Sequence, residues 1–303
     1  MTDQPRSRVF LWVIVGGGAF FLFLVAIFAL VYFSVRSQQK DTFAGFGDKI
    51  GVVDLEGVIL NPKDVVEQLR EFADDSSIKA IILHVDSPGG GAAASEEIYR
   101  EVLRIRDKKN KPIVASIGTV GASGAYYVSS AANKIFADDA SIVGSIGVIA
   151  EWYNYEELIK WAKLKAVVLK AGEFKDTGSP TRELTPAERA YLQGLIDDMH
   201  TQFIHSVAVG RKMNDDQIRS LADGKVWTGE QALPLKLVDQ IGDFRAAIDD
   251  TAKSVGIKGE PTIVHPEKER KSVLDLVFGD ASEYFPNPDK LMRSNVGFYY
   301  LWK

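Results

Sequence analysis

Gly121-Ala122-Ser123-Gly124-Ala125-Tyr126-Tyr127 is the stretch from which the rest of the chain is best interpreted. An apolar run at 113–117 precedes it and is typical of a buried strand, whereas the small residues at 127–134 favour a helix. Ser123 is therefore expected where a strand turns into a helix, with the helix N-terminus beneath its hydroxyl. A serine at such a position is most often only a helix cap, and a nucleophile is the sharper interpretation.

Composition narrows the function classes. The chain has 303 residues, enough for one domain of about 200 residues with extensions. A net charge of -5 gives no indication of nucleic-acid binding, and the absence of cysteine excludes disulfides, thiolate catalysis and cysteine-ligated zinc. The histidines are scattered, and their spacing is poor for a shared metal. We interpret all four as structural or surface residues and expect no metal and no cofactor: His84, His200, His205 and His265.

The N-terminal region predicts a membrane anchor. Val9–Val35 is uncharged and apolar, and it exceeds the ~20 residues needed to cross a bilayer. It ends without the small-residue site of a cleaved signal peptide, so the anchor is expected to remain attached. Arg6 and Arg8 precede this segment, and Arg36 and Lys40 follow it, so the flanking charges do not decide its orientation.

Strands and helices alternate in the following part of the chain. Apolar runs at 49–55, 80–85 and 113–117 predict strands, and helical patterns begin at Asn61–Pro62 and span Ala93–Arg106. This order predicts an α/β fold with a mainly parallel sheet. Further strands are expected at 135–137, 147–149 and 166–169, and a long helix should begin at Thr185–Pro186.

The candidate chemistry is acyl transfer, which needs a nucleophile, a base and donors for the oxyanion. Ser123 is the candidate nucleophile, and the amide of Gly124 is well placed as one donor. The turn Pro88–Gly91 suits the second donor, because glycine lets the backbone approach a ligand closely. The sequence leaves open whether Gly89 or Gly90 supplies that amide.

The base is expected to be a lysine, because none of the histidines has a convincing context. Burial lowers the pKa of a lysine, which lets it act as a neutral base. Lys175 follows the expected strand 166–169 in a loop beside Phe174, and the end of a strand could bring it to the cleft. An inward Asp176 carboxylate would oppose this by raising the pKa. The ordinary alternative is a surface loop lysine.

Taken together, the motifs resemble the signal peptide peptidase A family, in its short form with one catalytic domain per chain. The resemblance covers roughly Lys49–Thr262 and rests on Asp86–Gly90, Gly121–Tyr127, Gly144–Val148 and Lys175 in this order. It implies a crotonase-like or Clp-protease-like ββα superhelix with a Ser-Lys dyad. It further implies the following roles: Ser123 as nucleophile, Lys175 as general base, Gly89 and Gly124 as oxyanion donors, and Ser145 as a hydrogen-bond partner of the lysine.

The resemblance also implies a function and a location. The expected protein is a membrane-anchored serine endopeptidase that hydrolyses signal-peptide remnants and other apolar peptides, without nucleic acid as a partner. Homo-oligomeric rings are expected, in which neighbouring subunits can complete each active site. The expected organisation is an anchor and linker over 1–46, a protease domain over 47–264 and a C-terminal extension over 265–303. The anchor should cross the cytoplasmic membrane once and hold the catalytic domain outside the cytoplasm.

Two alternatives remain open. One is a catalytically silent membrane scaffold of the same fold, against which the presence of both Ser123 and Lys175 argues. The other is an acyl-CoA enzyme of the crotonase type, against which the anchor and the Ser-Lys pair argue. One departure from the family pattern is mild, since Ala125 stands where many relatives have glycine.

The C-terminal segment Gly297–Trp302 is apolar and aromatic, and such a segment is costly to leave in water. Prolines at 286 and 288 suggest that it is reached by an extended chain. Three positions are considered for it: packed on its own core, docked on a neighbouring subunit, or added as a strand to a peptide groove.

Overall fold

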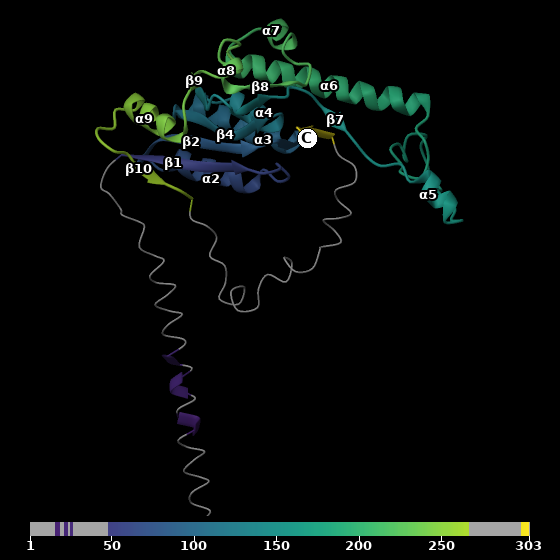
Figure 1. Ribbon diagram of the computed structural model, residues 1–303, viewed down its shortest axis with the longest axis horizontal. Helices are drawn as coiled ribbons and strands as arrows, with labels where there is room; N and C mark the ends of the chain where they lie inside the picture. Colours follow the sequence, from purple (N-terminus) through teal and green to yellow (C-terminus); the bar gives the residue numbers. More distant parts are fainter. Residues whose placement is uncertain (1–15, 19–20, 24, 27–47, 267–297, 303) are drawn as a thin grey trace, which may run out of the picture. The chain divides into compact units, whose positions relative to one another are not determined.

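The computed structural model describes residues 16–18, 21–23, 25–26, 48–266 and 298–302 (Figure 1). The chain divides into two compact units, Met1–Phe46 and Gly47–Lys303. Within the described residues, no helix is long and apolar enough to span a membrane. Most of the expected anchor Val9–Val35, and most of the expected extension 265–303, lies outside those residues.

A mainly parallel sheet forms the centre of the second unit, so the predicted mixed α/β class is confirmed. Its strands follow the order β10-β1-β2-β4-β5-β9, and every neighbouring pair along this path is parallel. In addition, β6 runs parallel to β4, and β8 pairs antiparallel with β6. The strands are β1 (Lys49–Glu56), β2 (Ile78–Ser87), β4 (Ile113–Ala122), β5 (Lys134–Ala137), β6 (Ile142–Gly144), β8 (Val226–Thr228), β9 (Gln240–Ile241) and β10 (Thr262–Val264).

Helices cover both faces of this sheet, which explains why the central strands are continuous apolar runs. Successive side chains of a strand point to opposite faces. Accordingly, Val53 belongs to the large core cluster that includes the inner faces of α2, α3 and α4, whereas Val52 packs with α9. These helices are α2 (Lys63–Asp74), α3 (Ala92–Arg104), α4 (Gly124–Ser130) and α9 (Phe244–Ser254); a π-helical turn, Ile105–Lys109, follows α3.

The long helix α6 (Pro186–Arg211) begins where the sequence predicts it. The hydroxyl of Thr185 accepts a hydrogen bond from the Glu188 amide, and the Glu188 carboxylate accepts one from the Thr185 amide. This reciprocal cap satisfies two amides of the first turn, and Pro186 needs no partner there. The short helices are α5 (Glu156–Trp161), α7 (Asp215–Arg219) and α8 (Gly229–Ala232).

The segment between β7 (Ile149–Ala150) and α6 differs from the prediction. Residues 166–169 were expected to form a buried strand, but they have no regular structure. Val167 is 79% exposed and Leu169 is 96% exposed. An apolar run identifies residues that favour burial, but it does not identify the surface against which they are buried. Within this chain, the segment that leads to Lys175 therefore lies outside the core.

A second, three-stranded sheet contains the end of the chain. Its order is β3-β11-β7, with β3 (Gly89–Gly91) and β11 (Phe298–Leu301), and both pairings are antiparallel. Figure 1 shows the C-terminus beside the start of α3 and near β7. Of the three positions considered for the tail, the structure shows strand addition within its own chain, with Tyr300 also buried in the core.

Candidate active site

Ser123 lies between β4 and α4, as the sequence predicts. Its backbone has φ 55° and ψ −118°, a conformation that L-residues adopt only under constraint. Two backbone bonds impose it: the Ser123 amide donates to the Gly144 carbonyl at 2.7 Å, and the Ser123 carbonyl accepts from the Tyr127 amide at 2.8 Å. The side chain of Ser123 makes no capping hydrogen bond. The helix-cap interpretation therefore fails, and the hydroxyl is not used by the helix that it precedes.

Ser123 and Ser145 both line a cavity of about 440 Å³. Ser145 is buried, has φ 52°, and donates its amide to the Lys225 carbonyl at 2.9 Å. The structure thus brings Ser123 and Ser145 to one cavity, although they come from different turns at the ends of β4 and β6.

His200 is a cavity residue that the sequence analysis interpreted as structural. It lies on α6 and lines the cavity that also contains Ser123. Its Nε2 atom is buried without a hydrogen-bond partner among the described residues. Such buried polar atoms are rare in folded proteins, so His200 is a candidate for contact with a bound peptide. Its position depends on how α6 packs, and no local sequence signal reports that.

The two glycine turns converge next to Ser123. A Cβ atom at Gly89 would come within 2.6 Å of the Gly124 amide nitrogen and 2.1 Å of the Tyr300 carbonyl oxygen. A Cβ atom at Gly124 would lie 3.0 Å from that same oxygen. Only glycine leaves this space, and Gly89 also has φ 97°. Gly89, Gly124 and the Tyr300 carbonyl therefore lie together beside Ser123.

The amide that faces this point is that of Gly90. The Gly89 amide donates to the Ser87 hydroxyl at 3.1 Å, and the Gly89 carbonyl accepts from Ile59. Successive residues of a strand direct their amides to opposite sides, so the Gly90 amide is directed at β11. Tyr300 lies directly opposite Gly90 in the antiparallel register. The Trp302 amide donates to the Pro88 carbonyl at 2.8 Å. Because hydrogen-bonded pairs alternate along an antiparallel ladder, Gly90 and Tyr300 form the next hydrogen-bonded pair.

The tail covers the candidate nucleophile. Ser123 is 1% exposed, and Leu301 and Trp302 line the same cavity as Ser123. The tail strand lies between β3 and β7, where it pairs with Gly89–Gly91 on one side and Ile149–Ala150 on the other. An extended peptide is thus held by two strands directly beside Ser123.

The structure does not bring Lys175 to Ser123 within one chain. Lys175 is exposed in a turn-rich loop and is absent from the described lining of the cavity. Asp176 turns away from it to a pair of cations, with Arg182 Nη2 at 2.9 Å and Lys170 as the second partner. Hydrogen bonds from Arg182 and Lys170 lower the pKa of Asp176 to about 2. The Asp176 carboxylate is therefore paired with Arg182 and Lys170.

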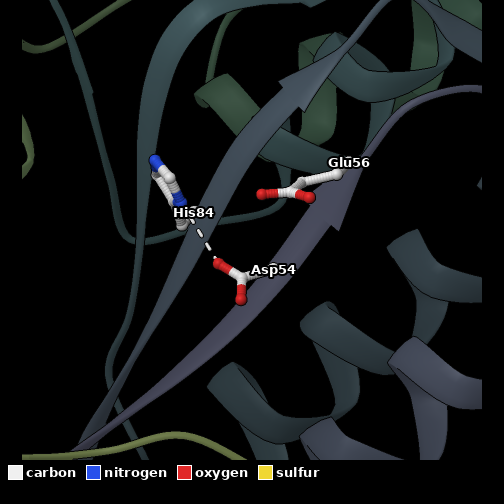
Figure 2. Close-up of side chains that lie close together, drawn as sticks. All are labelled: Asp54, Glu56 and His84. Atoms are coloured by element: carbon white, nitrogen blue, oxygen red, sulfur yellow. Dashed lines mark hydrogen bonds and ion pairs between the residues drawn. The ribbon is translucent and has the colours of Figure 1, made fainter.

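One mixed histidine and carboxylate cluster lies away from the cavity. Figure 2 shows Asp54 and Glu56 on β1 facing His84 on the neighbouring strand β2. His84 Nδ1 lies 3.1 Å from Asp54 Oδ1, and the imidazole packs 4.7 Å from the ring of Phe244. The side chains are partly exposed, and the contact between Asp54 and His84 is a cross-strand hydrogen bond. None of the three residues is among the described lining of the Ser123 cavity.

Comparison with known proteins identifies the family. The model of peptidase family S49 matches residues 105–258. A candidate protease of Synechocystis sp. is 34% identical over 244 residues, which cover 80% of this chain and 87% of that protein. A candidate signal peptide peptidase SppA of Enterococcus faecium is 36% identical over 193 residues, covering 64% of this chain and 56% of that protein.

A third relative is the chloroplastic serine protease SPPA of Arabidopsis thaliana, which is 29% identical over 235 residues, or 77% of this chain and 34% of that protein. These matches confirm the resemblance that the motifs indicate. The parallel α/β core also fits a Clp-protease-like fold. The chain therefore belongs to peptidase family S49.

Proposed function

We propose that the protein is a serine endopeptidase in which Ser123 is the nucleophile. The observation that carries the proposal is the peptide strand β11 that lies beside Ser123, paired on both sides. The Ser123 hydroxyl, which makes no capping hydrogen bond, and the convergent glycines supply two requirements of acyl transfer, a nucleophile and the oxyanion donors. Membership of family S49, and the name of the Arabidopsis relative, support a peptidase of the serine type.

A substrate would bind as β11 does, as an added strand between β3 and β7. Its scissile carbonyl would then lie where the Tyr300 carbonyl lies, between the amides of Gly124 and Gly90. These amides are the proposed oxyanion donors, because the Gly89 amide is already bonded to Ser87. In this proposal Gly89 has a different role from the one implied by the resemblance: its positive φ turns the chain so that Gly90 faces the substrate.

The proposed base is Lys175, supplied by a neighbouring copy of the chain. In a single chain Lys175 is exposed, whereas the acceptor of the Ser123 proton has to lie within hydrogen-bond reach. A loop that lies outside its own core can reach the cavity of a second subunit in a homo-oligomer. Ser145, on the wall of that cavity, would then hold the lysine amine by a hydrogen bond. The family resemblance supports this arrangement.

Labelling with a serine-directed fluorophosphonate tests the proposal. We expect the wild-type chain to be labelled, and the Ser123→Ala variant to remain unlabelled although it is folded. A chain that remains unlabelled both as wild type and as Tyr300→Ala, which weakens the tail that covers Ser123, would favour either a silent scaffold or a crotonase-type enzyme. Hydrolysis of an acyl-CoA by the same preparation would then decide between those two.

We further propose that Val9–Val35 anchors the protein in the cytoplasmic membrane, with the catalytic domain outside the cytoplasm. Its substrates would be signal-peptide remnants and other apolar peptides, which lie in or near the bilayer. The apolar character of the segment and the name of the Enterococcus relative support this proposal. Digestion of intact spheroplasts by an added protease should degrade the catalytic domain. A domain that is degraded only after lysis would contradict the orientation.

A further inference from the structure

Side chains that can ligate a metal gather at the carboxyl ends of three neighbouring strands. Asp54 and Glu56 lie at the end of β1, His84 lies opposite Asp54 on β2, and His265 directly follows β10. These strands are adjacent in the order β10-β1-β2. The sequence analysis interpreted both histidines as structural or surface residues, because their spacing along the chain gives no sign of the sheet that joins them.

The same change of residue type occurs on each of these strands. On the face that α9 covers, Val52 and Ile82 belong to one apolar core cluster, and Ile263 packs against it. Two residues further along each strand, the same face carries a residue that can ligate a metal. These residues are Asp54, His84 and His265. The apolar face therefore ends at one level across three strands, and ligands of parallel sheets bind at such carboxyl ends.

The ligand atoms are close to one another. Figure 2 shows the carboxylates of Asp54 and Glu56 facing the imidazole of His84, and one ligand atom from each lies within 4.8 Å of the other two. Asp54 also faces a second imidazole: its Oδ1 lies 3.1 Å from His84 Nδ1, and its Oδ2 lies 4.0 Å from His265 Nδ1. Ligand atoms that share one zinc ion at about 2.0–2.2 Å lie roughly 3–4 Å apart. Small side-chain rotations would therefore bring these atoms to one ion.

The carboxylates of this cluster have no basic partner of their own. Asp54 and Glu56 are two residues apart on one strand, so their side chains lie on the same face. Among the residues that the structure describes, neither carboxylate pairs with a lysine or an arginine. A divalent cation between the two would remove the repulsion of these like charges. The side chains of His84 and Asp54 are 30% and 45% exposed, so an ion can enter from solvent and keep water as a further ligand.

His84 is oriented by contacts on both sides of its ring. The ring packs against Phe244 at 4.7 Å between centroids. At the edge away from the carboxylates, His84 Nε2 and Asp86 Oδ2 both lie within 4.0 Å of the place that a Cβ atom of Gly118 would take. Asp86 is fixed there, because its Oδ1 accepts the Val120 amide at 3.2 Å. A metal-ligating histidine usually donates its second ring N–H to a carboxylate or carbonyl, and Asp86 is placed for that role.

We propose that this cluster is a binding site for zinc or a similar divalent transition-metal ion, with four protein ligands: Asp54, Glu56, His84 and His265. Imidazole nitrogen as a ligand favours zinc over magnesium and calcium, which prefer oxygen alone. The bound ion ties the ends of β10, β1 and β2 together and so stabilises this edge of the fold. It takes no part in the chemistry at Ser123, since none of its ligands is among the described lining of that cavity.

Zinc titration of the full chain tests the site. The protein is first freed of metal with a chelator, and Zn²⁺ is then added in competition with a chromophoric zinc indicator. We expect one tight site in the wild type. His84→Gln and Glu56→Gln should each weaken this binding at least about 100-fold, because each removes a ligand. His265→Gln should weaken it about tenfold, since its Nδ1 is the more distant imidazole nitrogen from Asp54.

A second histidine–carboxylate pair provides a matched control. His205 Nδ1 lies 3.2 Å from Asp215 Oδ2, and both side chains are exposed. Within the described part of the chain, no third ligand joins this pair to form a metal-binding group. His205→Gln should therefore leave the tight site unchanged. An equal loss in His205→Gln, or full zinc binding in both His84→Gln and Glu56→Gln, would overturn the proposal.

Thermal unfolding gives a second readout that does not depend on peptidase activity. Zn²⁺ should raise the Tm of the wild type, because an ion that binds only the folded state stabilises it. The same concentration should not raise the Tm of Glu56→Gln, whose exposed side chain can change without disturbing the core. The Tm of the two proteins should be similar in excess chelator, which shows that the variant is folded. Equal stabilisation by Mg²⁺ or Ca²⁺ would refute a site built on imidazole ligands.

Discussion

Ser123 is held in a backbone conformation that glycine adopts more easily, and such a residue costs about 1–3 kcal/mol. Replacing Ser123 by glycine should therefore raise the free energy of unfolding relative to Ser123→Ala, by about 1 kcal/mol, and both variants should lack peptidase activity. Urea unfolding of the two variants, with peptide hydrolysis measured in parallel, checks this. Residual hydrolysis above a few per cent would contradict the assignment of the nucleophile.

Substitutions at Lys175 and His200 test which of the two residues is the general base. If Lys175 removes the Ser123 proton, Lys175→Ala should lower kcat at least about 100-fold, because general-base catalysis contributes that much. His200→Gln should keep kcat within about tenfold of wild type. The reverse pattern of losses, measured at several pH values, would make His200 the base.

Local signals explain which site residues can be found from the sequence. Three predicted features lie at the ends of apolar strands: Ser123, Gly124 and the turn Pro88–Gly91. At these points the residue types themselves indicate the change from strand to turn. His200 has no such signal, because only the packing of α6 directs it to the cavity. Lys175 was predicted correctly as a loop residue, but its approach to Ser123 is not formed within one chain.

At the scale of the elements, the loop that carries Lys175 is fixed to the start of α6 by an ionic cluster. Arg182 Nη1 donates to Glu188 Oε2 at 2.8 Å, and Arg182 Nε donates to Asp176 Oδ2 at 3.1 Å. These hydrogen bonds lower the pKa of both carboxyl groups, and that of Asp176 to about 2. The stabilisation is therefore complete above pH ~5.5, where both unfolded carboxyls are ionised, and is lost as the pH falls through the lowered pKa values of the folded state.

Removing Arg182 should reduce this acid sensitivity of the loop, while Lys170 keeps its contact with Asp176. In Arg182→Ala, amide hydrogen exchange of residues 170–188 should be faster than in wild type at pH 5, and the difference between the two proteins should shrink as the pH is lowered towards 2. Arg189→Ala is the control, since Arg189 is exposed one turn into the same helix. An equal effect of both variants would show that the cluster does not hold the loop.

The elements of the core follow the sequence closely, and the exceptions are informative. α6 is predicted at its first residue because its cap is local, formed by Thr185, Pro186 and Glu188. The run 166–169 is mispredicted as a buried strand because its apolar residues specify burial without a partner. In the β3-β11 pairing, Gly89–Gly91 pairs with Tyr299–Leu301, which is far away in the sequence. No pattern of side chains predicts this pairing.

At the scale of the whole molecule, the proposed dyad requires two copies of the chain. Co-expressing the inactive variants Ser123→Ala and Lys175→Ala should restore part of the peptidase activity, because mixed oligomers contain interfaces with one intact serine and one intact lysine. Mixing either variant with itself is the control and should restore none. Failure of the mixed preparation, despite hetero-oligomers seen on a sizing column, would place the dyad within one chain.

In the proposed binding mode, the ladder between β3 and β11 would select substrates by their main chain. Its hydrogen bonds use the backbone of a glycine strand, so most of a substrate is accepted whatever its side chains are. Proline has no amide to give, and the amides of the residues at the positions of Tyr300 and Trp302 are used by this ladder. Proline at either place breaks the strand pairing. The proposed endopeptidase would thus skip peptide bonds that have proline at either position, and fragments that contain these bonds would be left for other peptidases.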